Sequence, residues 1–126
     1  VRGLPGNSSM LPSTNMIRIF NHLPSESLNE ELQKAHWVIC RSGYSSVMDM
    51  AILGKKSIQI PTPGQTEQEY LASLYQQQQT AYTVTQEHFS LTAALTEAAQ
   101  FNYRHFPVSG NNALSPVISR FLASLQ

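Results

Sequence analysis

Charged residues are scarce in this sequence. They make up only 13% of its 126 residues, about half the usual share for a soluble domain. Eight basic and eight acidic side chains balance to a formal charge of zero, and no run of like charges occurs. Nucleic acids and anionic membranes require a clustered positive surface, so we expect neither as the main partner.

Cysteine and the common metal and nucleotide motifs are also nearly absent. The single Cys40 excludes a disulfide framework and any multi-cysteine metal site, and is typical of a reducing compartment. No apolar stretch approaches the ~20 residues that cross a membrane. The four histidines lack metal-ligand spacing, and no Asp-x-Asp pair, G-x-x-x-x-G-K-[ST] loop or G-x-S-x-G motif occurs. We therefore expect no metal and no bound cofactor.

The rest of the composition is that of one folded domain. Hydrophobic residues make up 41% and aromatic residues 9%, enough for a core, and the length predicts a single domain over 1–126. Serine, threonine, asparagine and glutamine replace the missing charges, and Gln76 to Gln79 form a glutamine run. Such a neutral polar surface either faces a substrate read by hydrogen bonds or is only solvated.

Strand and helix patterns alternate along the chain. Short apolar runs predict strands over 16–20, 37–40, 57–60 and 81–84. Apolar side chains at helical spacing predict helices over 27–35, 44–53, 66–79, 91–98 and 114–125. The pairs Ser27/Glu30 and Thr66/Glu69 have the spacing of capping boxes, and Gly54 fits a helix C-terminus. This order predicts an α/β fold with an open, doubly wound parallel sheet that binds ligands at the carboxyl ends of its strands.

The first candidate site is the turn after the strand at 37–40. Gly43 allows a sharp turn and a close approach of a ligand to the backbone. The amides of residues 43–46 then begin a helix, whose partial positive charge and unpaired donors suit a phosphate. Ser42, Ser45 and Asp49 line one polar face opposite Val47, where the carboxylate can accept two hydrogen bonds from a ribose diol. The alternative is a plain turn followed by an exposed helix aspartate.

The second candidate site is the turn after the strand at 57–60. Two prolines and a glycine in 61–64 predict a stiff loop before the next helix. Gln68 and Glu69 in the first helical turn are suited to sugar hydroxyls, which pair with both donors and acceptors. Glu69 has an alternative role in the capping box with Thr66, whereas we assign Gln68 no such structural duty.

These two turns carry a family resemblance. The segment C-R-S-G-Y-S-S-V-M-D-M-A-I-L-G-K-K-S-I-Q-I-P-T-P-G-Q-T-E-Q-E-Y, residues 40–70, resembles the donor-binding signature of family 28 glycosyltransferases. That pattern runs through a buried strand, an R-S-G turn, a helix with an acidic residue, a strand, a proline and a loop ending in Q-Q or Q-E. The family includes the enzyme that adds N-acetylglucosamine to the lipid-linked peptidoglycan precursor. The match covers roughly residues 16–90.

The resemblance implies a set of donor-binding residues. The acidic ribose ligand falls on Asp49, the sugar-contacting pair on Gln68 and Glu69, and the phosphate-binding helix start on residues 42–46. The nucleobase contact, made partly through backbone, falls near Phe20 and Asn21. The full donor-binding set is Arg41, Ser42, Gly43, Tyr44, Ser45, Ser46, Asp49, Gln65, Thr66, Gln68 and Glu69.

Three departures from the family pattern indicate a branch distinct from the peptidoglycan enzyme. Asp49 stands where the family usually has glutamate, and is shorter by one methylene. Ala72 replaces an asparagine common after the Q-Q pair, and Lys55-Lys56 replaces a small residue followed by proline. These changes affect the identity of the sugar more than that of the nucleotide.

The resemblance also implies a reaction and partners. The fold is the carboxyl-terminal half of a two-domain, Rossmann-like GT-B glycosyltransferase, and we expect the first strand, its glycine-rich loop and the acceptor-binding amino-terminal half to lie outside this chain. The reaction is inverting, metal-independent transfer of a hexose from a nucleotide-diphosphate sugar of the UDP type, and the catalytic base belongs to the other half. The implied location is the cytoplasm, with any association at the inner face of the membrane made through that half. Two alternatives stay open: a donor-binding subunit that works with a separate acceptor protein, and a nucleotide-sugar 2-epimerase.

Overall fold

A computed structural model describes residues 1–9 and 11–106 of the chain, so the helix predicted over 114–125 lies outside the described residues. The chain divides into two compact units, Val1–Ala35 and His36–Gln126. The first unit holds one helix, α1 (Ser25–Lys34), preceded by loop, and the second holds all the strands of the described part.

The loop of the first unit contains no strand where one was predicted. Met16 is 95% exposed and Ile17 59% exposed. The N–H of Ile19 donates to Ser13 Oγ at 3.1 Å, and the N–H of Arg2 donates to the Phe20 carbonyl at 2.8 Å. An alternating pattern forms a strand where its apolar side chains are buried on a pleated surface, and here they are not. The strand predicted over 16–20 is therefore wrong.

Helix α1 begins earlier than its sequence signal indicated. Pro24 is the N-cap residue, and the N–H of Leu28 already donates to its carbonyl at 2.9 Å. Ser27 thus lies inside the first turn, and no side chain caps the helix. The capping box predicted for Ser27 and Glu30 is wrong, because the fixed φ of proline lets it end the incoming loop and start the helix directly.

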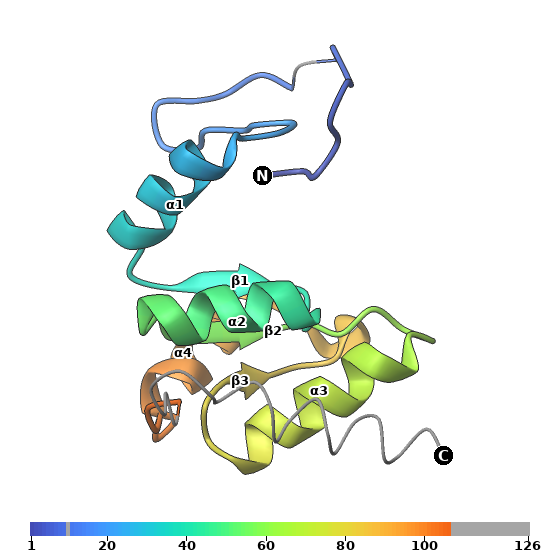
Figure 1. Cartoon of the computed structure of the whole chain (residues 1–126), viewed down its shortest axis with the longest axis vertical. Coiled ribbons are helices and arrows are strands. Elements are labelled where there is room, and N and C mark those ends of the chain that lie inside the picture. Colours follow the sequence, from blue (N-terminus) through green and yellow to red (C-terminus); the bar gives the residue numbers. More distant parts are fainter. Residues whose placement is uncertain (10, 107–126) are drawn as a thin grey trace. The chain divides into compact units, whose positions relative to one another are not determined.

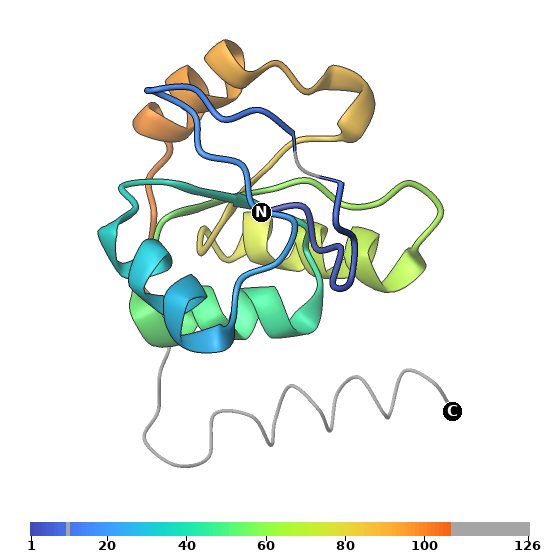
Figure 2. The same ribbon diagram turned by 90° about the horizontal axis from the view of Figure 1, so that it is seen from above.

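The second unit is an α/β layer structure around a parallel sheet (Figure 1). The strands β1 (Val38–Cys40), β2 (Ser57–Gln59) and β3 (Tyr82–Thr83) lie in the order β1-β2-β3. Ile39 pairs with Ile58, and Ile58 with Tyr82. The helices are α2 (Tyr44–Leu53), α3 (Thr66–Gln77) and α4 (Leu91–Gln100), with a short 3-10 helix η1 (Gln86–His88) after β3. Figure 2 shows α2 and α3 on one face of the sheet and α4 on the other.

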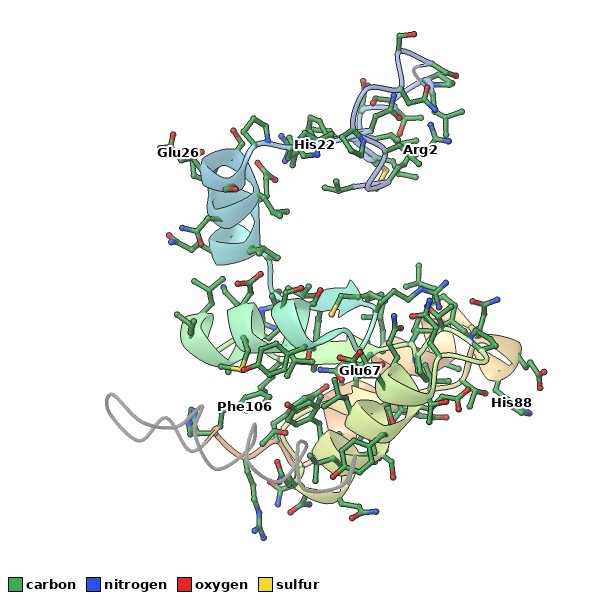
Figure 3. The ribbon with its side chains drawn as sticks, turned by 45° about the vertical axis from the view of Figure 1, so that its right-hand side comes forward. Arg2, His22, Glu26, Glu67, His88 and Phe106 are labelled. Atoms are coloured by element: carbon green, nitrogen blue, oxygen red, sulfur yellow. The ribbon has the colours of Figure 1, made fainter. Side chains whose placement is uncertain are left out.

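This arrangement confirms the predicted Rossmann-like α/β class. Strands form within the predicted ranges 37–40, 57–60 and 81–84, and a helix comes after each of them. The central strand β2 is buried along its whole length. On one face Ile58 packs with Ala94 and Ala98 of α4. On the other face a cluster of Val47, Leu71, Tyr75 and Ala81 packs between α2, α3 and the sheet, and Phe106 covers it with its ring 5.4 Å from that of Tyr75 (Figure 3).

Gly54 ends α2 as the sequence predicted. Its φ of 61° lies in the left-handed region, which glycine enters without the penalty of a Cβ. Its N–H donates to the Ala51 carbonyl and the N–H of Lys55 to that of Met50, so the last turn of α2 is closed and the chain is redirected into β2. Within residues 1–9 and 11–106, none of the helices combines the length and the apolar character needed to cross a membrane.

Candidate functional site

Three loops meet at the carboxyl edge of the sheet. Because the strands are parallel, the segments that follow β1, β2 and β3 all emerge at this edge. They are the turn at 41–43, the loop at 60–65 and the segment at 84–88. Both turns singled out in the sequence are therefore brought to the same end of the second unit, where open α/β sheets bind ligands.

The turn after β1 presents the start of α2 without a side-chain cap. Gly43 is the N-cap residue, and the first helical hydrogen bond runs from the N–H of Val47 to its carbonyl at 3.1 Å. The preceding N–H groups, on residues 44–46, therefore have no acceptor within the helix. They carry the positive end of the helix dipole, which suits an anion.

Of the two reasons predicted for a glycine at position 43, a sharp turn and a close approach of a ligand, the sharp turn is wrong. The Gly43 φ of −69° and ψ of 147° are extended backbone that any residue adopts, so the turn itself does not require glycine. A Cβ built on Gly43 would meet nothing within 4 Å among the described residues. The missing Cβ instead leaves the space beside the helix start open to another molecule.

Ser42 does not share the exposed face of Ser45 and Asp49. It is fully buried, and its Oγ donates a 2.7 Å hydrogen bond to the carbonyl of Gln68 in α3. Ser45 and Asp49 are both exposed, one helical turn apart, while Val47 is buried on the opposite face as expected. The polar face predicted for the first turn therefore consists of Ser45 and Asp49, and Ser42 links the two turns instead.

The side chains of the second turn hold the loop that precedes α3. Gln68 Oε1 accepts a 2.9 Å hydrogen bond from the N–H of Thr62, and its Nε2 donates to Gln65 Oε1. Glu69 Oε1 accepts a 3.0 Å hydrogen bond from the N–H of Gly64. Gln68 therefore has a structural role in this loop, although its position in the sequence predicted none.

The capping box predicted for Thr66 and Glu69 is wrong in register. Gln65 is the N-cap residue, Thr66 is already the first residue of α3, and no side chain caps the helix. A capping box pairs the N-cap residue with the residue three positions later, which here is Gln68. Glu69 reaches back past the cap to the loop amide of Gly64, where the loop has a φ of 80°.

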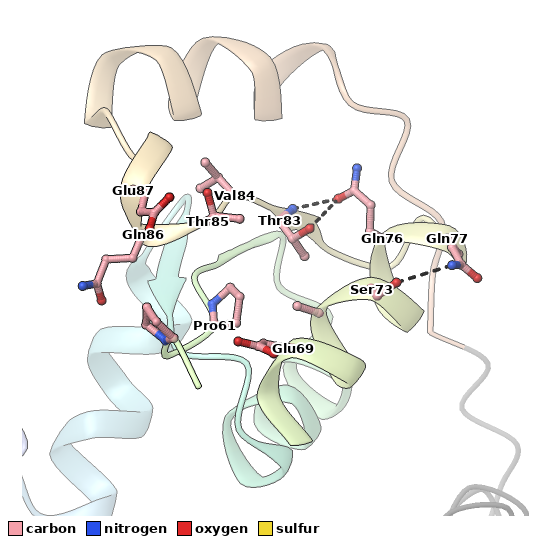
Figure 4. A pocket seen from close by; sticks show the side chains of 12 residues that line it. Pro61, Glu69, Ser73, Gln76, Gln77, Thr83, Val84, Thr85, Gln86 and Glu87 are labelled. Carbon is pink, nitrogen blue, oxygen red and sulfur yellow. Dashed lines mark hydrogen bonds between the residues drawn. The ribbon is translucent and has the colours of Figure 1, made fainter. Parts of the chain in front are cut away.

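A pocket of about 680 Å³ lies between α3, along its length from Glu69 to Gln77, and the segment that begins at the end of β3 (Figure 4). Glu69 and Glu87 lie at its wall, and its described lining includes no basic side chain. Gln76 Oε1 accepts hydrogen bonds from the N–H of Thr83 at 2.7 Å and its Oγ1 at 3.2 Å, which fixes the α3 wall against β3. The lining residues are Pro61, Pro63, Glu69, Ala72, Ser73, Gln76, Gln77, Thr83, Val84, Thr85, Gln86 and Glu87. Such a mixture of carboxylates, amides, hydroxyls and apolar carbons suits a neutral polyhydroxylated group better than a phosphate.

Most of this lining was missed by sequence reasoning. The glutamine run at 76–79 was recognised as a neutral polar surface, but its contact with β3 depends on how α3 packs. The threonines at 83 and 85 fall at the end of a short strand, a position that becomes informative only once the sheet order is known.

Arg41 connects all three loops. Its Nη1 donates to the carbonyls of Ile60 at 3.3 Å and Pro61 at 3.4 Å, and its Nη2 donates to Gln86 Oε1 at 2.9 Å. The planar fork of a guanidinium supports such divergent contacts from one rigid group. The side chain expected to bind the donor is thus engaged by the protein's own loops.

Cys40, at the end of β1, is an unreactive thiol in this setting. Burial raises the pKa of its thiol from 9.0 to about 11, so the nucleophilic thiolate is scarce at neutral pH. Among the described residues, no three His, Cys, Asp or Glu side chains are grouped so that they could hold a metal ion.

Phe20 and Asn21, expected near the nucleobase, belong to the first unit. The Asn21 amide donates to the carbonyls of Asn7 at 2.8 Å and Ser9 at 2.7 Å, and its Oδ1 accepts from Arg2 at 2.9 Å. The Phe20 ring lies 5.8 Å from the guanidinium of Arg18. These contacts show what orders the two residues within their own unit, and their role toward a base stays a prediction.

Comparison with known proteins identifies the family of this chain. Residues 11–120 match the sequence profile described as "Glycosyltransferase family 28 C-terminal domain". Relatives named "UDP-N-acetylglucosamine--N-acetylmuramyl-(pentapeptide) pyrophosphoryl-undecaprenol N-acetylglucosamine transferase" include that of Rhodopseudomonas palustris (strain BisB18), 34% identical over 80 residues, which are 62% of this chain and 20% of the relative. The protein of that name from Methylobacterium sp. (strain 4-46) is 33% identical over 63 residues, 50% of this chain and 16% of the relative.

The chain thus spans a fifth or less of the length of these two relatives. The matches favour neither the 2-epimerase nor the separate-subunit alternative.

Proposed function

The chain belongs to the glycosyltransferase family 28 C-terminal domain family, and on this premise we propose that it binds a nucleotide-diphosphate sugar, of the UDP type, for hexosyl transfer. The observation that carries the proposal is the uncapped start of α2, which lies beside an open glycine and at the carboxyl edge of a parallel sheet. A diphosphate is the part of the donor that this helix start suits.

The remaining parts of the donor are assigned by chemistry. The diphosphate lies on the amides of residues 43–46, where Tyr44, Ser45 and Ser46 supply N–H groups that have no acceptor within α2. Asp49, exposed one turn further along α2, accepts the two hydroxyls of the ribose. An anionic diphosphate is disfavoured in the neighbouring pocket, because Glu69 and Glu87 line it and its described lining carries no cation.

The hexose is assigned to the second turn. Glu69 keeps one oxygen for the N–H of Gly64, and its other oxygen is available to a sugar hydroxyl at the pocket wall. Gln65 and Gln68 shape this wall by holding the loop at 61–65 against the start of α3. Ala72, at the same wall, leaves more room than the asparagine of the family pattern.

The reaction that fits is a single displacement with inversion at the anomeric carbon. A base removes the acceptor's proton while the nucleotide diphosphate leaves, and the amides and dipole at the start of α2 stabilise the leaving charge. No residue of the described site is assigned as that base, and we propose that it comes from an acceptor-binding amino-terminal domain or partner chain. The names of the relatives include an undecaprenol-linked acceptor, and on that ground we propose a lipid-linked acceptor for this chain. We also propose that the reaction takes place in the cytoplasm or at the inner face of the membrane, as the family resemblance implies.

Nuclear magnetic resonance titration of the chain with UDP, UDP-N-acetylglucosamine and inorganic phosphate tests the proposal. The amides of residues 43–49 are expected to shift with both nucleotides, and those around Glu69 with the sugar nucleotide only. Unchanged amides at 43–49 at millimolar nucleotide would contradict the assignment. Equal responses to nucleotide and phosphate would reduce the site to a general anion site.

A further inference from the structure

We propose that Arg41 is a positioning residue and does not itself bind the donor. It sets the spacing between the turn at 41–43, called here the phosphate turn, and the pocket between α3 and the segment after β3, called here the sugar pocket. This inference rests on the proposed function for its ligand and on the hydrogen bonds of the Arg41 guanidinium for its mechanism. The geometry joins Arg41 to a loop at each side of the candidate site.

The backbone of Arg41 belongs to the phosphate turn. The residue follows β1 directly and is separated from the N-cap Gly43 only by the fully buried Ser42. Fixing the guanidinium therefore fixes the entry of the turn whose amides begin α2. The burial of Ser42 and its bond to the Gln68 carbonyl hold the same turn from the other side.

The far end of the side chain belongs to the sugar pocket. Nη2 donates to Gln86 Oε1 at 2.9 Å, and Gln86 is the first residue of η1 and part of the pocket wall. Nη1 donates to the carbonyls of Ile60 and Pro61, and Pro61, in the loop after β2, also lines the pocket. One planar group thus holds two segments that line the pocket, the loop after β2 and the segment after β3, at a fixed distance from the turn at 41–43.

These contacts also occupy the guanidinium. Its two terminal nitrogens are directed at acceptors of the chain itself, so a direct bond to a phosphate would have to replace one of them. A lysine cannot substitute in this role, because a single ammonium does not present the divergent fork that reaches Pro61 and Gln86 together. A direct charge contact, in contrast, would tolerate lysine.

The test compares the variants Arg41→Ala, Arg41→Lys, Gln86→Ala and the double variant Arg41→Ala/Gln86→Ala in the full chain. The Kd is measured for UDP and for UDP-N-acetylglucosamine. The Kd for UDP divided by the Kd for UDP-N-acetylglucosamine reports the contribution of the sugar to binding. Positioning predicts that Arg41→Ala and Arg41→Lys each reduce this ratio by about threefold to tenfold, that Gln86→Ala reduces it in part, and that the double variant is no worse than Arg41→Ala. Arg104→Ala, which removes an exposed arginine that lines a different pocket, is the matched control and should leave the ratio unchanged.

Two outcomes would overturn the inference. In the first, the affinities for both nucleotides fall equally in Arg41→Ala, recover in Arg41→Lys and are unchanged in Gln86→Ala. That result would show that Arg41 contacts the phosphates directly. If the melting temperature falls while the ratio stays constant, the side chain serves stability alone.

Hydrogen exchange without ligand separates this inference from the proposed function. Loss of the link should accelerate exchange of the Thr62, Gly64 and His88 amides in Arg41→Ala relative to Arg104→Ala. If the unsubstituted chain binds neither nucleotide, the proposed function fails, and the exchange rates alone decide whether Arg41 links the loops. Unchanged exchange at all three amides would refute the link whether or not nucleotide binds.

Discussion

The Ser42 hydroxyl donates a 2.7 Å hydrogen bond to the main-chain carbonyl of Gln68, and this bond joins the two turns of the candidate site. Ser42 is the middle residue of the turn at 41–43, between β1 and α2, and Gln68 lies in the first turn of α3. A buried hydroxyl normally requires such a partner, so the contact serves folding and site geometry together.

Replacing Ser42 by alanine should lower the free energy of unfolding by about 0.5–1.5 kcal/mol, the usual net contribution of a neutral hydrogen bond. Urea-induced unfolding followed by circular dichroism measures the loss. Ser45→Ala is the matched control, since Ser45 is exposed on the next turn and should change stability by less than about 0.5 kcal/mol. Equal losses in the two variants would show that the Ser42 bond contributes nothing specific.

Asp49→Asn should weaken UDP binding by about tenfold to a hundredfold, because a charge-assisted hydrogen bond is worth about 1.5–3 kcal/mol. The melting temperature should hardly change, since the carboxylate is exposed. Isothermal titration calorimetry gives the Kd. Glu26→Gln, at an exposed glutamate of the first unit, controls for the lost charge. An unchanged Kd would show that Asp49 is an exposed helix residue with no role in binding UDP.

Gln68→Ala should reduce both stability and affinity for UDP-N-acetylglucosamine. The Thr62 N–H loses its 2.9 Å acceptor, so the free energy of unfolding should fall by about 0.5–1.5 kcal/mol. Gln68→Glu keeps an oxygen for Thr62 and should restore most of the stability. Thermal unfolding of the two variants side by side checks this. Full stability in Gln68→Ala would mean that the loop does not depend on this amide.

Glu69→Gln should weaken binding of UDP-N-acetylglucosamine while UDP binds as before. Glutamine still offers an oxygen to the Gly64 N–H, so the loop is kept, but the charged acceptor for a sugar hydroxyl is lost. Competition titrations with the two nucleotides measure the difference. Glu67→Gln, in the same turn but outside the pocket lining, is the control. Equal weakening of UDP and the sugar nucleotide would place Glu69 away from the sugar.

Stability should decline in alkali between about pH 9 and pH 11 through Cys40. Its pKa is 9.0 when exposed and about 11 in the fold, so below pH 9 the thiol is protonated in both states. Between the two values the unfolded chain releases the proton first, and the free energy of unfolding falls as pH rises. Cys40→Ala should make the curve shallower in this window when urea unfolding is repeated at each pH. Identical slopes would refute the assignment to Cys40.

Sequence reasoning succeeded where local pattern and burial agree. The run at 37–40 is apolar and becomes β1, the periodic segment up to Leu53 becomes α2, and Gly54 has the left-handed φ its position required. The order of strands and helices then determines a parallel sheet, because such connections are right-handed crossovers. The order of elements alone therefore predicts that both turns lie at one edge of the sheet.

Sequence reasoning failed where side chains compete for the same backbone groups. The alternating residues 16–20 form no strand because Met16 and Ile17 stay exposed. In α3 the residue spacing could not show whether Thr66 or Gln65 is the cap, since both fit before an acidic first turn. The engagement of Arg41 and Ser42 with other loops depends on packing between elements far apart in the chain, which no local pattern contains.

The shortness of β3 has a consequence for how the site opens. Only two residues, Tyr82 and Thr83, pair with β2, so little backbone bonding must be broken to detach this edge strand. Elements with few bonds open first in native proteins, well below the free energy of global unfolding. One wall of the pocket follows this strand, so detaching it would take apart the sugar site while β1, β2 and the start of α2 stay intact. A ligand bound in the pocket would stabilise the paired state of β3, by an amount that grows with the ratio of ligand concentration to Kd. Bound ligand would thus compensate for the few hydrogen bonds of this short strand.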